Sequence, residues 1–232
     1  MVTTYKKVGV DITEIKKSQG AIGKIISSTH RTQKLAKVTH GFGHYAGIVQ
    51  IPGNKFLATH TDGVGTKIMI ANALKKYDTI GIDCIAMNVN DVICIGATPI
   101  SFVDYIAANK NNQAIFKKVV KGLAKGAREA RVPIIGGETA IMPDLFSGKN
   151  FAMDLAGTVV GILTQKEMIV GKSIKPGDVI IGVKSSGLHS NGYTLARNVL
   201  LSKYKLNSRI KGIGHLGNAM LKPTEIYVKP VL

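Results

Sequence analysis

The sequence predicts an α/β or α+β fold, because strand-like and helix-like segments alternate along most of its 232 residues. Hydrophobic residues make up 45% of the chain and charged residues 19%, which allows a full core and argues against disorder. A turn-rich stretch at residues 171–178 interrupts the alternation. We therefore expect one domain at residues 1–167 and the beginning of a second at residues 168–232.

The first predicted elements are two strands joined by a tight turn. Residues 46–51 and 56–61 flank residues 52–54 (PGN), whose composition suits a hairpin. The following elements are expected as helices at 66–76 and 79–95, a strand at 100–107, a basic amphipathic helix at 112–130, a short buried strand at 132–135 and a longer strand at 153–163. Past the boundary we expect a strand at 179–183 and a helix at 192–202.

Composition narrows the class of protein. A formal charge of +17 could indicate nucleic acid, an anionic membrane or phosphorylated substrates as partners. The basic residues are scattered and aromatic residues are only 6%, so solvated basic faces are favoured over a nucleic-acid surface. No apolar run approaches the roughly 20 residues that span a bilayer, and we expect a soluble, cytoplasmic protein. Cys84 and Cys94 are expected to be buried free thiols.

The first motif is residues 61–67 (TDGVGTK), at the end of a predicted strand and the start of a helix. Gly63 and Gly65 allow close backbone approach to a ligand, and amides at a helix start attract phosphate. Lys67 adds a positive charge, and Asp62 offers a hard oxygen of the kind that Mg²⁺ prefers. The spacing differs from that of a Walker A loop. A tight turn with a capping aspartate is an equally good interpretation.

The second motif is residues 88–91 (NVND), with Asp83 upstream, within the helix at 79–95, for which Asp78 is the expected N-cap and Gly96 the stop. Asp83 and Asn90 align on one helix face within about 20°, and Asp91 lies about 80° further round. These polar groups are costly to bury without partners, which a metal–phosphate site would supply. An exposed polar stripe is the alternative.

The third motif is residues 136–143 (GGETAIMP), directly after a predicted strand. A glycine pair followed by Glu138 and Thr139 suits a loop that contacts a ligand at the carboxyl end of a strand. A plain loop is the alternative interpretation.

The fourth motif is residues 185–192 (SSGLHSNG), between a strand and a helix. Ser186, Asn191 and the backbone amides at the helix start would form an anion cradle. His189 could act as an acid or base near neutral pH, although a lone loop histidine is more often structural or exposed.

The fifth motif, residues 41–47 (GFGHYAG), has a spacing that differs from the dinucleotide-binding fingerprint and precedes a strand. A mobile glycine-rich flap over a ligand explains it better.

Taken in order, these segments resemble the phosphoribosylformylglycinamidine cyclo-ligase (aminoimidazole ribonucleotide synthetase) family. The resemblance spans nearly the whole chain and also includes residues 5–12 (YKKVGVDI), 78–83 (DTIGID), 96–99 (GATP) and 223–229 (PTEIYVK). It implies a mixed-sheet N-terminal domain that dimerises through its sheet, with nucleotide bound near that interface, and a C-terminal α/β domain.

The resemblance also implies an activity. The family uses ATP and Mg²⁺ to close the imidazole ring of formylglycinamidine ribonucleotide in purine synthesis, so the expected partners are a small phosphorylated ribonucleotide and a second copy of the chain. Functional positions of the family match Asp62, Asp91 and Glu138 as ligands of Mg²⁺ and nucleotide phosphates, with Asp91, Glu138 and His189 as catalytic residues. The expected cofactor-binding residues are Asp62, Gly63, Gly65, Thr66, Lys67, Asn90, Thr139, Ser186 and Asn191.

The sequence departs from the family pattern in two ways. Val8 replaces the usual alanine, and His40, His44 and Tyr45 make the flap bulkier. The sequence also stops at Leu232, where the family continues for more than a hundred residues with a further glycine-rich substrate loop. A truncated, non-catalytic dimer module, a related ATP-dependent phosphotransfer enzyme and a basic nucleic-acid-binding protein are the competing hypotheses.

Overall fold

The computed structural model describes residues 3–32, 34–146 and 150–232. Its centre is a six-stranded sheet of order β1-β2-β3-β6-β4-β5. All neighbouring strands are antiparallel except β4 and β5, which are parallel. The strands are β1 (Lys37–His40), β2 (Gly47–Ile51), β3 (Lys55–Gly63), β4 (Thr98–Ala108), β5 (Ile134–Ile141) and β6 (Met153–Thr164). The mixed sheet confirms the expected fold class.

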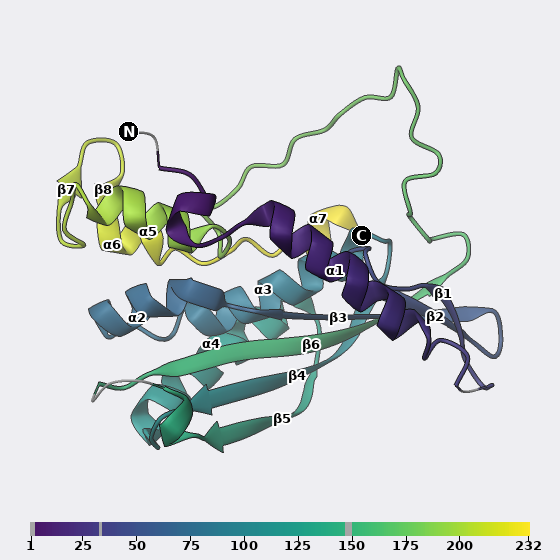
Figure 1. Cartoon of the computed structure of the whole chain (residues 1–232), viewed down its shortest axis with the longest axis horizontal. Coiled ribbons are helices and arrows are strands. Elements are labelled where there is room, and N and C mark those ends of the chain that lie inside the picture. Colours follow the sequence, from purple (N-terminus) through teal and green to yellow (C-terminus); the bar gives the residue numbers. More distant parts are fainter. Residues whose placement is uncertain (1–2, 33, 147–149) are drawn as a thin grey trace.

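Helices α3 (Ile80–Ile93) and α4 (Gln113–Ala130) pack over one face of this sheet (Figure 1). Alternate residues of β6, from Met153 through Leu155 and Val159 to Leu163, are buried against them, as the two-residue period of a strand requires. The lysines of α4 point away from this core and are exposed. The other sheet face, called the outer face below, stays half-exposed and includes Val103 and Tyr105.

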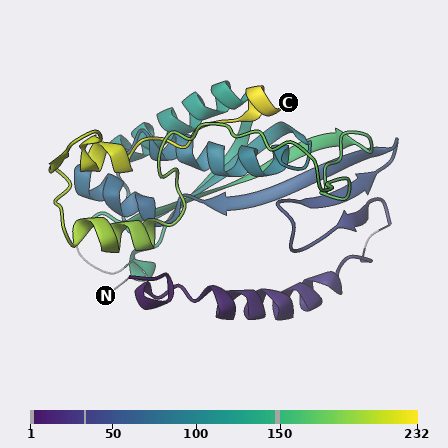
Figure 2. The same cartoon turned by 90° about the horizontal axis from the view of Figure 1, so that it is seen from above.

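The C-terminal part lies beside α2 (Ile68–Leu74) and the short 3-10 helix η2 (Gly65–Lys67). Its elements are α5 (Tyr193–Leu201), β7 (Arg209–Ile210), β8 (Gly214–His215), α6 (Leu216–Met220) and α7 (Val228–Val231). At the N-terminus, η1 (Lys6–Val8) precedes α1 (Ile12–Ser27), which has no buried residue and lies outside the packed body (Figure 2). A last 3-10 helix, η3, covers Pro143–Leu145.

Most predicted elements are confirmed to within a few residues: the hairpin, the helices at 66–76, 79–95, 112–130 and 192–202, and the strands at 100–107 and 153–163. Gly96 follows the end of α3 in a left-handed conformation, as expected of a helix stop. Helices α1, α6 and α7 and strand β1 were not predicted.

Four predictions were wrong. Thr79, not Asp78, is the N-cap residue of α3, and no side-chain hydrogen bond caps that helix. Strand β5 begins later than residue 132 and continues through the expected loop at 136–141, mostly exposed because it is an edge strand that pairs only with β4. Cys94 is exposed, since it lies just past the end of α3, whereas Cys84 is buried.

The fourth wrong prediction is the strand at 179–183. This segment has no regular secondary structure and pairs with no strand in the described part of the chain, and Ile180 is 95% exposed. It belongs to the long green segment that leaves the body between β6 and α5 in Figure 1. A strand needs a neighbour for its backbone hydrogen bonds, so an apolar β-branched run alone does not form one.

Candidate functional site

The turn at residues 61–67 is built on the end of β3 and is held by a buried side chain of α3. The Asp62 amide donates to Asn88 Oδ1 (3.0 Å), and Asn88 Nδ2 donates back to the Asp62 carbonyl (3.1 Å). Gly65 follows with φ of +65°, a left-handed conformation that favours glycine. Asn88 belongs to the second motif but was given no binding or catalytic role from the sequence; it is a fully buried polar residue in an otherwise apolar helix.

Asp62 and Asp91 lie within electrostatic reach of each other, Asp62 on the helix-covered face of the sheet and Asp91 on α3. The pKa of the Asp91 carboxyl is raised by burial and further by the nearby Asp62 carboxylate, against the opposing effect of His60. His60 Nε2 lies 3.1 Å from Asp91 Oδ2. Two neighbouring carboxylates suit Mg²⁺, which proteins commonly bind through one or two carboxylates together with water and substrate phosphates. The donor set therefore fits the expected metal.

Glu138 is not brought to this pair. In the sheet register Asp62 lies opposite Gly157 and therefore on the helix-covered face, whereas Glu138 lies beside Tyr105 on the outer face. Three strand spacings of about 4.8 Å also separate β3 from β5. Within residues 3–32, 34–146 and 150–232, no group of three or more His, Cys, Asp or Glu side chains could hold a metal ion.

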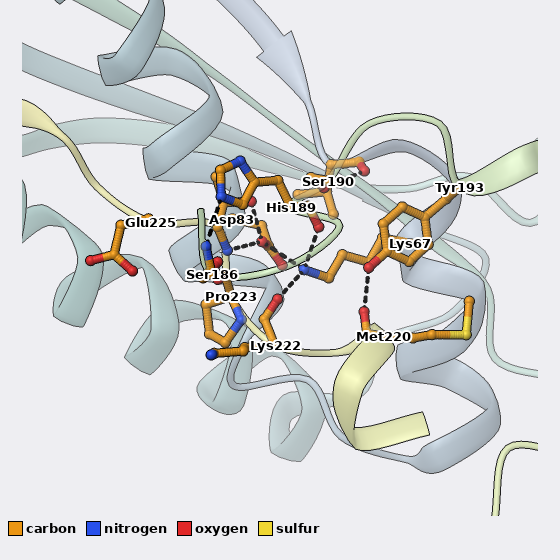
Figure 3. A network of polar contacts seen from close by, with 12 residues as sticks. Lys67, Asp83, Ser186, His189, Ser190, Tyr193, Met220, Lys222, Pro223 and Glu225 are labelled. Atoms are coloured by element: carbon orange, nitrogen blue, oxygen red, sulfur yellow. Dashed lines mark hydrogen bonds and ion pairs between the residues drawn. The ribbon is translucent and has the colours of Figure 1, made fainter. Parts of the chain in front are cut away.

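Lys67 is fully buried, although the sequence predicted that it would meet a nucleotide. Its ammonium donates to Asp83 Oδ1 (2.8 Å) and to the carbonyl oxygens of His189 (2.8 Å) and Lys222 (2.7 Å), as Figure 3 shows. Burial lowers the pKa of Lys67 and raises that of Asp83, while the attraction between their charges opposes both shifts. Asp83 is therefore neither an exposed polar stripe nor part of the Asp62–Asp91 pair.

The loop at 185–192 packs against this buried lysine. His189 has φ of +57°. Its Nε2 accepts a hydrogen bond from the Ser186 amide (3.3 Å), which places the ring proton of the neutral form on Nδ1, and it also lies 3.4 Å from the Tyr227 hydroxyl. The pKa of His189 is lowered, first by burial and then by the Lys67 charge. Ser190 Oγ donates to the Val64 carbonyl (3.0 Å), which ties the loop to the turn at 61–67.

Two further predicted residues make contacts within the protein. Asn90 Nδ2 donates to the Glu225 carbonyl (2.8 Å) and its Oδ1 accepts from the Tyr227 amide (3.0 Å). Ser186 Oγ donates to the Pro223 carbonyl (2.6 Å). Both side chains thus hold the segment at 222–227 in place.

The remaining predicted residues are more open. Thr66 Oγ1 lies 3.3 Å from Thr194 Oγ1, between η2 and α5. Gly63 is half-buried, and Asn191 is exposed at the start of α5. Thr139 is exposed on edge strand β5, in register with Ile106 and so on the face opposite to Glu138.

The glycine-rich segment at 41–47 borders an open cavity of about 610 Å³. The cavity lies between α1 and strands β1 to β3 and is lined by several histidines and hydroxyls, including His40, His44, Tyr45 and Thr61. Gln19 and Ile26 of α1 form its opposite wall. Its position beside the Asp62 turn fits the expected flap over a ligand.

Comparisons with known proteins agree with this architecture. The N-terminal domain of the AIR synthase related protein family matches residues 43–163, and the C-terminal domain of that family matches residues 175–232. A phosphoribosylformylglycinamidine cyclo-ligase of Pyrococcus furiosus is 49% identical over 99% of this chain and 67% of its own length. The protein of that name from Methanocaldococcus jannaschii is 46% identical over 100% of this chain and 64% of its own.

Solved structures support the fold. The AaThiL structure complexed with AMPPCP and TMP matches with a TM-score of 0.59 and 15% identity, covering 91% of this chain and 60% of the other. The thiamine-monophosphate kinase of Stenotrophomonas maltophilia K279a matches with a TM-score of 0.52 and 18% identity, covering 90% and 62%. The family matches and the close relatives together show that this chain belongs to the AIR synthase related family, and within it to the phosphoribosylformylglycinamidine cyclo-ligases, of which it spans about two thirds of the length.

Proposed function

We propose that the protein is an ATP-dependent cyclo-ligase that converts formylglycinamidine ribonucleotide to aminoimidazole ribonucleotide in cytoplasmic purine synthesis. The observation that carries this proposal is the Asp62–Asp91 pair, fixed by Asn88 at the end of β3 and tied to the His189 loop through Ser190 and Val64. The cyclo-ligases of Pyrococcus furiosus and Methanocaldococcus jannaschii are 49% and 46% identical to the chain. The open cavity bordered by the segment at 41–47 reaches Asp91 through one lining residue, His60, and we propose that it holds part of the nucleotide.

In this proposal Asp62 and Asp91 would hold Mg²⁺, which would neutralise charge on the phosphates of ATP when bound. Transfer of the γ-phosphoryl group of ATP to the formyl amide oxygen would release ADP and make that oxygen part of a phosphate leaving group. An internal nitrogen of the substrate would then close the ring by displacing inorganic phosphate. The neutral His189 ring presents its Nδ1–H donor from a fixed backbone, and this group suits hydrogen bonding to the substrate near the reacting oxygen. Gly63, Gly65 and Thr66 allow the backbone of the turn to approach phosphate.

Glu138 has a different place in this proposal, because it lies across the sheet from Asp62 and Asp91. We assign it to the outer face, which we propose as the homodimer surface. That face exposes Val103 (37%) and Tyr105 (41%) beside half-buried aliphatic residues of β6. A patch of this kind is typical of a protein–protein contact.

We also propose that residues 1–167 form the nucleotide-binding and dimerisation domain and that residues 168–232 begin the next domain.

The dimer proposal is tested by sedimentation. Val103→Asp places a charge in the centre of the outer face and should convert a dimer to a monomer, whereas Val120→Asp on the exposed side of α4 should leave the dimer intact. A wild-type protein that sediments as a monomer at all concentrations would remove the proposal.

The activity is tested by titration calorimetry with Mg-ATP and by phosphate release with formylglycinamidine ribonucleotide. Asp62→Asn and Asp91→Asn should each weaken Mg-ATP binding at least about tenfold, a loss of about 1.4 kcal/mol. Asp78→Asn is the matched control, because Asp78 is exposed and lies away from the pair. Binding without phosphate release would leave a nucleotide-binding module and refute the enzyme. ADP formation without ring closure would indicate another phosphotransfer reaction.

A further inference from the structure

The buried ion pair between Lys67 and Asp83 is the feature that the proposed chemistry does not use. Both side chains have no exposed surface, and Lys67 Nζ lies 2.8 Å from Asp83 Oδ1. Burying two charges is costly, and their mutual attraction offsets that cost only when good geometry and further hydrogen bonds accompany the pair. A pair in this position therefore needs an explanation in terms of what it holds together.

The hydrogen bonds of Lys67 are complete without a ligand. An ammonium group has three donors, and these meet Asp83 Oδ1 and the backbone carbonyls of His189 and Lys222. The Tyr193 ring lies against the same ammonium, 5.6 Å from Nζ to the ring centroid. No donor of Lys67 remains for a nucleotide phosphate.

Asp83 gathers the other side of the network. Its Oδ1 also accepts from the amide and the hydroxyl of Thr224, each at 2.7 Å. The pair thus connects four segments: the turn at 61–67, helix α3, the loop at 185–192 and the segment at 222–227 (Figure 3).

The loop at 185–192, which the Lys67–Asp83 pair contacts, is strained at His189. His189 is one of four non-glycine residues with positive φ among the described residues, and a left-handed conformation is unfavourable for a residue with a Cβ atom. The Lys67 ammonium binds the carbonyl of that same residue. Ser186, which sets the ring through its amide, is held by Pro223, next to the Lys222 carbonyl that Lys67 also binds.

We propose that Lys67 and Asp83 are positioning residues, which hold His189 in its left-handed conformation and keep its ring in the Nδ1–H tautomer, and that Lys67 does not bind phosphate. The proposal rests on the proposed function only where it gives His189 a role toward substrate. The geometry of the latch, meaning the Lys67–Asp83 pair with its four backbone and side-chain contacts, stands without that role.

The test compares Lys67→Met, Asp83→Asn and the double variant K67M/D83N. Each single variant leaves one buried charge without its partner, so its urea midpoint should fall well below that of the double variant. The double variant replaces both charged side chains with uncharged ones of similar shape, so we use it for the decisive measurement. Lys76→Met is the matched control, because Lys76, which follows α2, donates an exposed hydrogen bond to Asn218 of α6.

The decisive measurement is the ¹⁵N spectrum of the His189 imidazole, assigned by its loss in His189→Gln and recorded without nucleotide or substrate. The wild type and K76M should show an unprotonated Nε2, whereas K67M/D83N should shift toward a mixture of both tautomers. A wild-type His189 spectrum in folded K67M/D83N would overturn the proposal. Thr224→Val, which removes one contact of Asp83, should give a smaller shift and provides the same test if the double variant does not fold.

Nucleotide binding separates this proposal from its alternative. If Lys67 were a phosphate ligand, K67M/D83N would lose at least tenfold in Mg-ATP affinity while the His189 spectrum stayed the same, and that result would refute the latch. Because the spectrum needs no ligand, failure of the proposed enzyme activity would leave the tautomer result readable.

Discussion

Asn88 offers the sharpest test of how the fold builds the site. Its side chain is fully buried and makes three hydrogen bonds, two with the backbone of Asp62 and one with the Cys84 carbonyl (2.9 Å). At about 1 kcal/mol net for each bond, Asn88→Ala should lose about 3 kcal/mol, because the Asp62 amide is also left without its partner. In a chain of this size that loss corresponds to a fall in Tm of roughly 6–12 °C.

The assay is urea unfolding followed by circular dichroism, together with Mg-ATP titration on the folded variant. Asn198→Ala is the matched control, since Asn198 is exposed and makes one hydrogen bond, to the Thr194 carbonyl, within its own helix. It should change stability by less than about 0.5 kcal/mol. Asn88→Ala within the range of that control would refute the reasoning that Asn88 holds the turn. A variant that is destabilised but binds Mg-ATP like wild type would refute its link to Asp62.

Three further predictions concern the backbone and pH. Gly65→Ala should cost about 1–2 kcal/mol in urea unfolding, because φ is +65° and no atom lies within 4 Å of the added Cβ, whereas Gly20→Ala in α1 should be neutral or stabilising. Gly81→Ala should cost about 1–3 kcal/mol by the same assay, although alanine has the better helix propensity. The added Cβ would clash with the Leu123 amide nitrogen and push α3 away from α4. Wild-type stability of this variant would contradict that contact. The pKa of His189 is lowered below 6.5 in the folded protein, so the unfolded chain binds more protons near that pH. The difference in unfolding free energy between wild type and His189→Gln should therefore be largest above pH 6.5 and fall as the pH drops toward the folded-state pKa. A difference that does not change with pH would contradict this prediction.

Local patterns were enough to predict most of the fold. The helix at 79–95 combines apolar residues at helical spacing with a glycine stop, and the structure places α3 at Ile80–Ile93. The same kind of evidence failed where a neighbour decides the outcome. Residues 136–141 have the composition of a loop but pair with β4, whereas residues 179–183 have the composition of a strand but pair with nothing in the described chain. Pairing is a tertiary property, and composition does not contain it.

The candidate site shows the same limit at the level of single residues. The sequence analysis grouped Asp62, Asp91 and Glu138 because all three are carboxylates in motifs that resemble those of the family. Only the sheet register reveals that Glu138 lies on the other face, because a shift of one residue along a strand reverses the direction of its side chain. A motif therefore predicts which residue types are needed, while the strand period decides which of them can meet.

Lys67 shows most clearly that distant residues decide the role of a motif residue. In a glycine-rich turn a lysine is most simply interpreted as a phosphate ligand, and nothing within residues 61–67 contradicts that. Its actual partners, Asp83 and the carbonyls of His189 and Lys222, lie 16, 122 and 155 residues away in sequence. Because those partners use every donor of the ammonium, the charge joins the two parts of the site instead of meeting the ligand. The turn would then approach phosphate through the backbone around Gly63 and Gly65 and metal through Asp62, with Lys67 fixing the distance from that turn to His189.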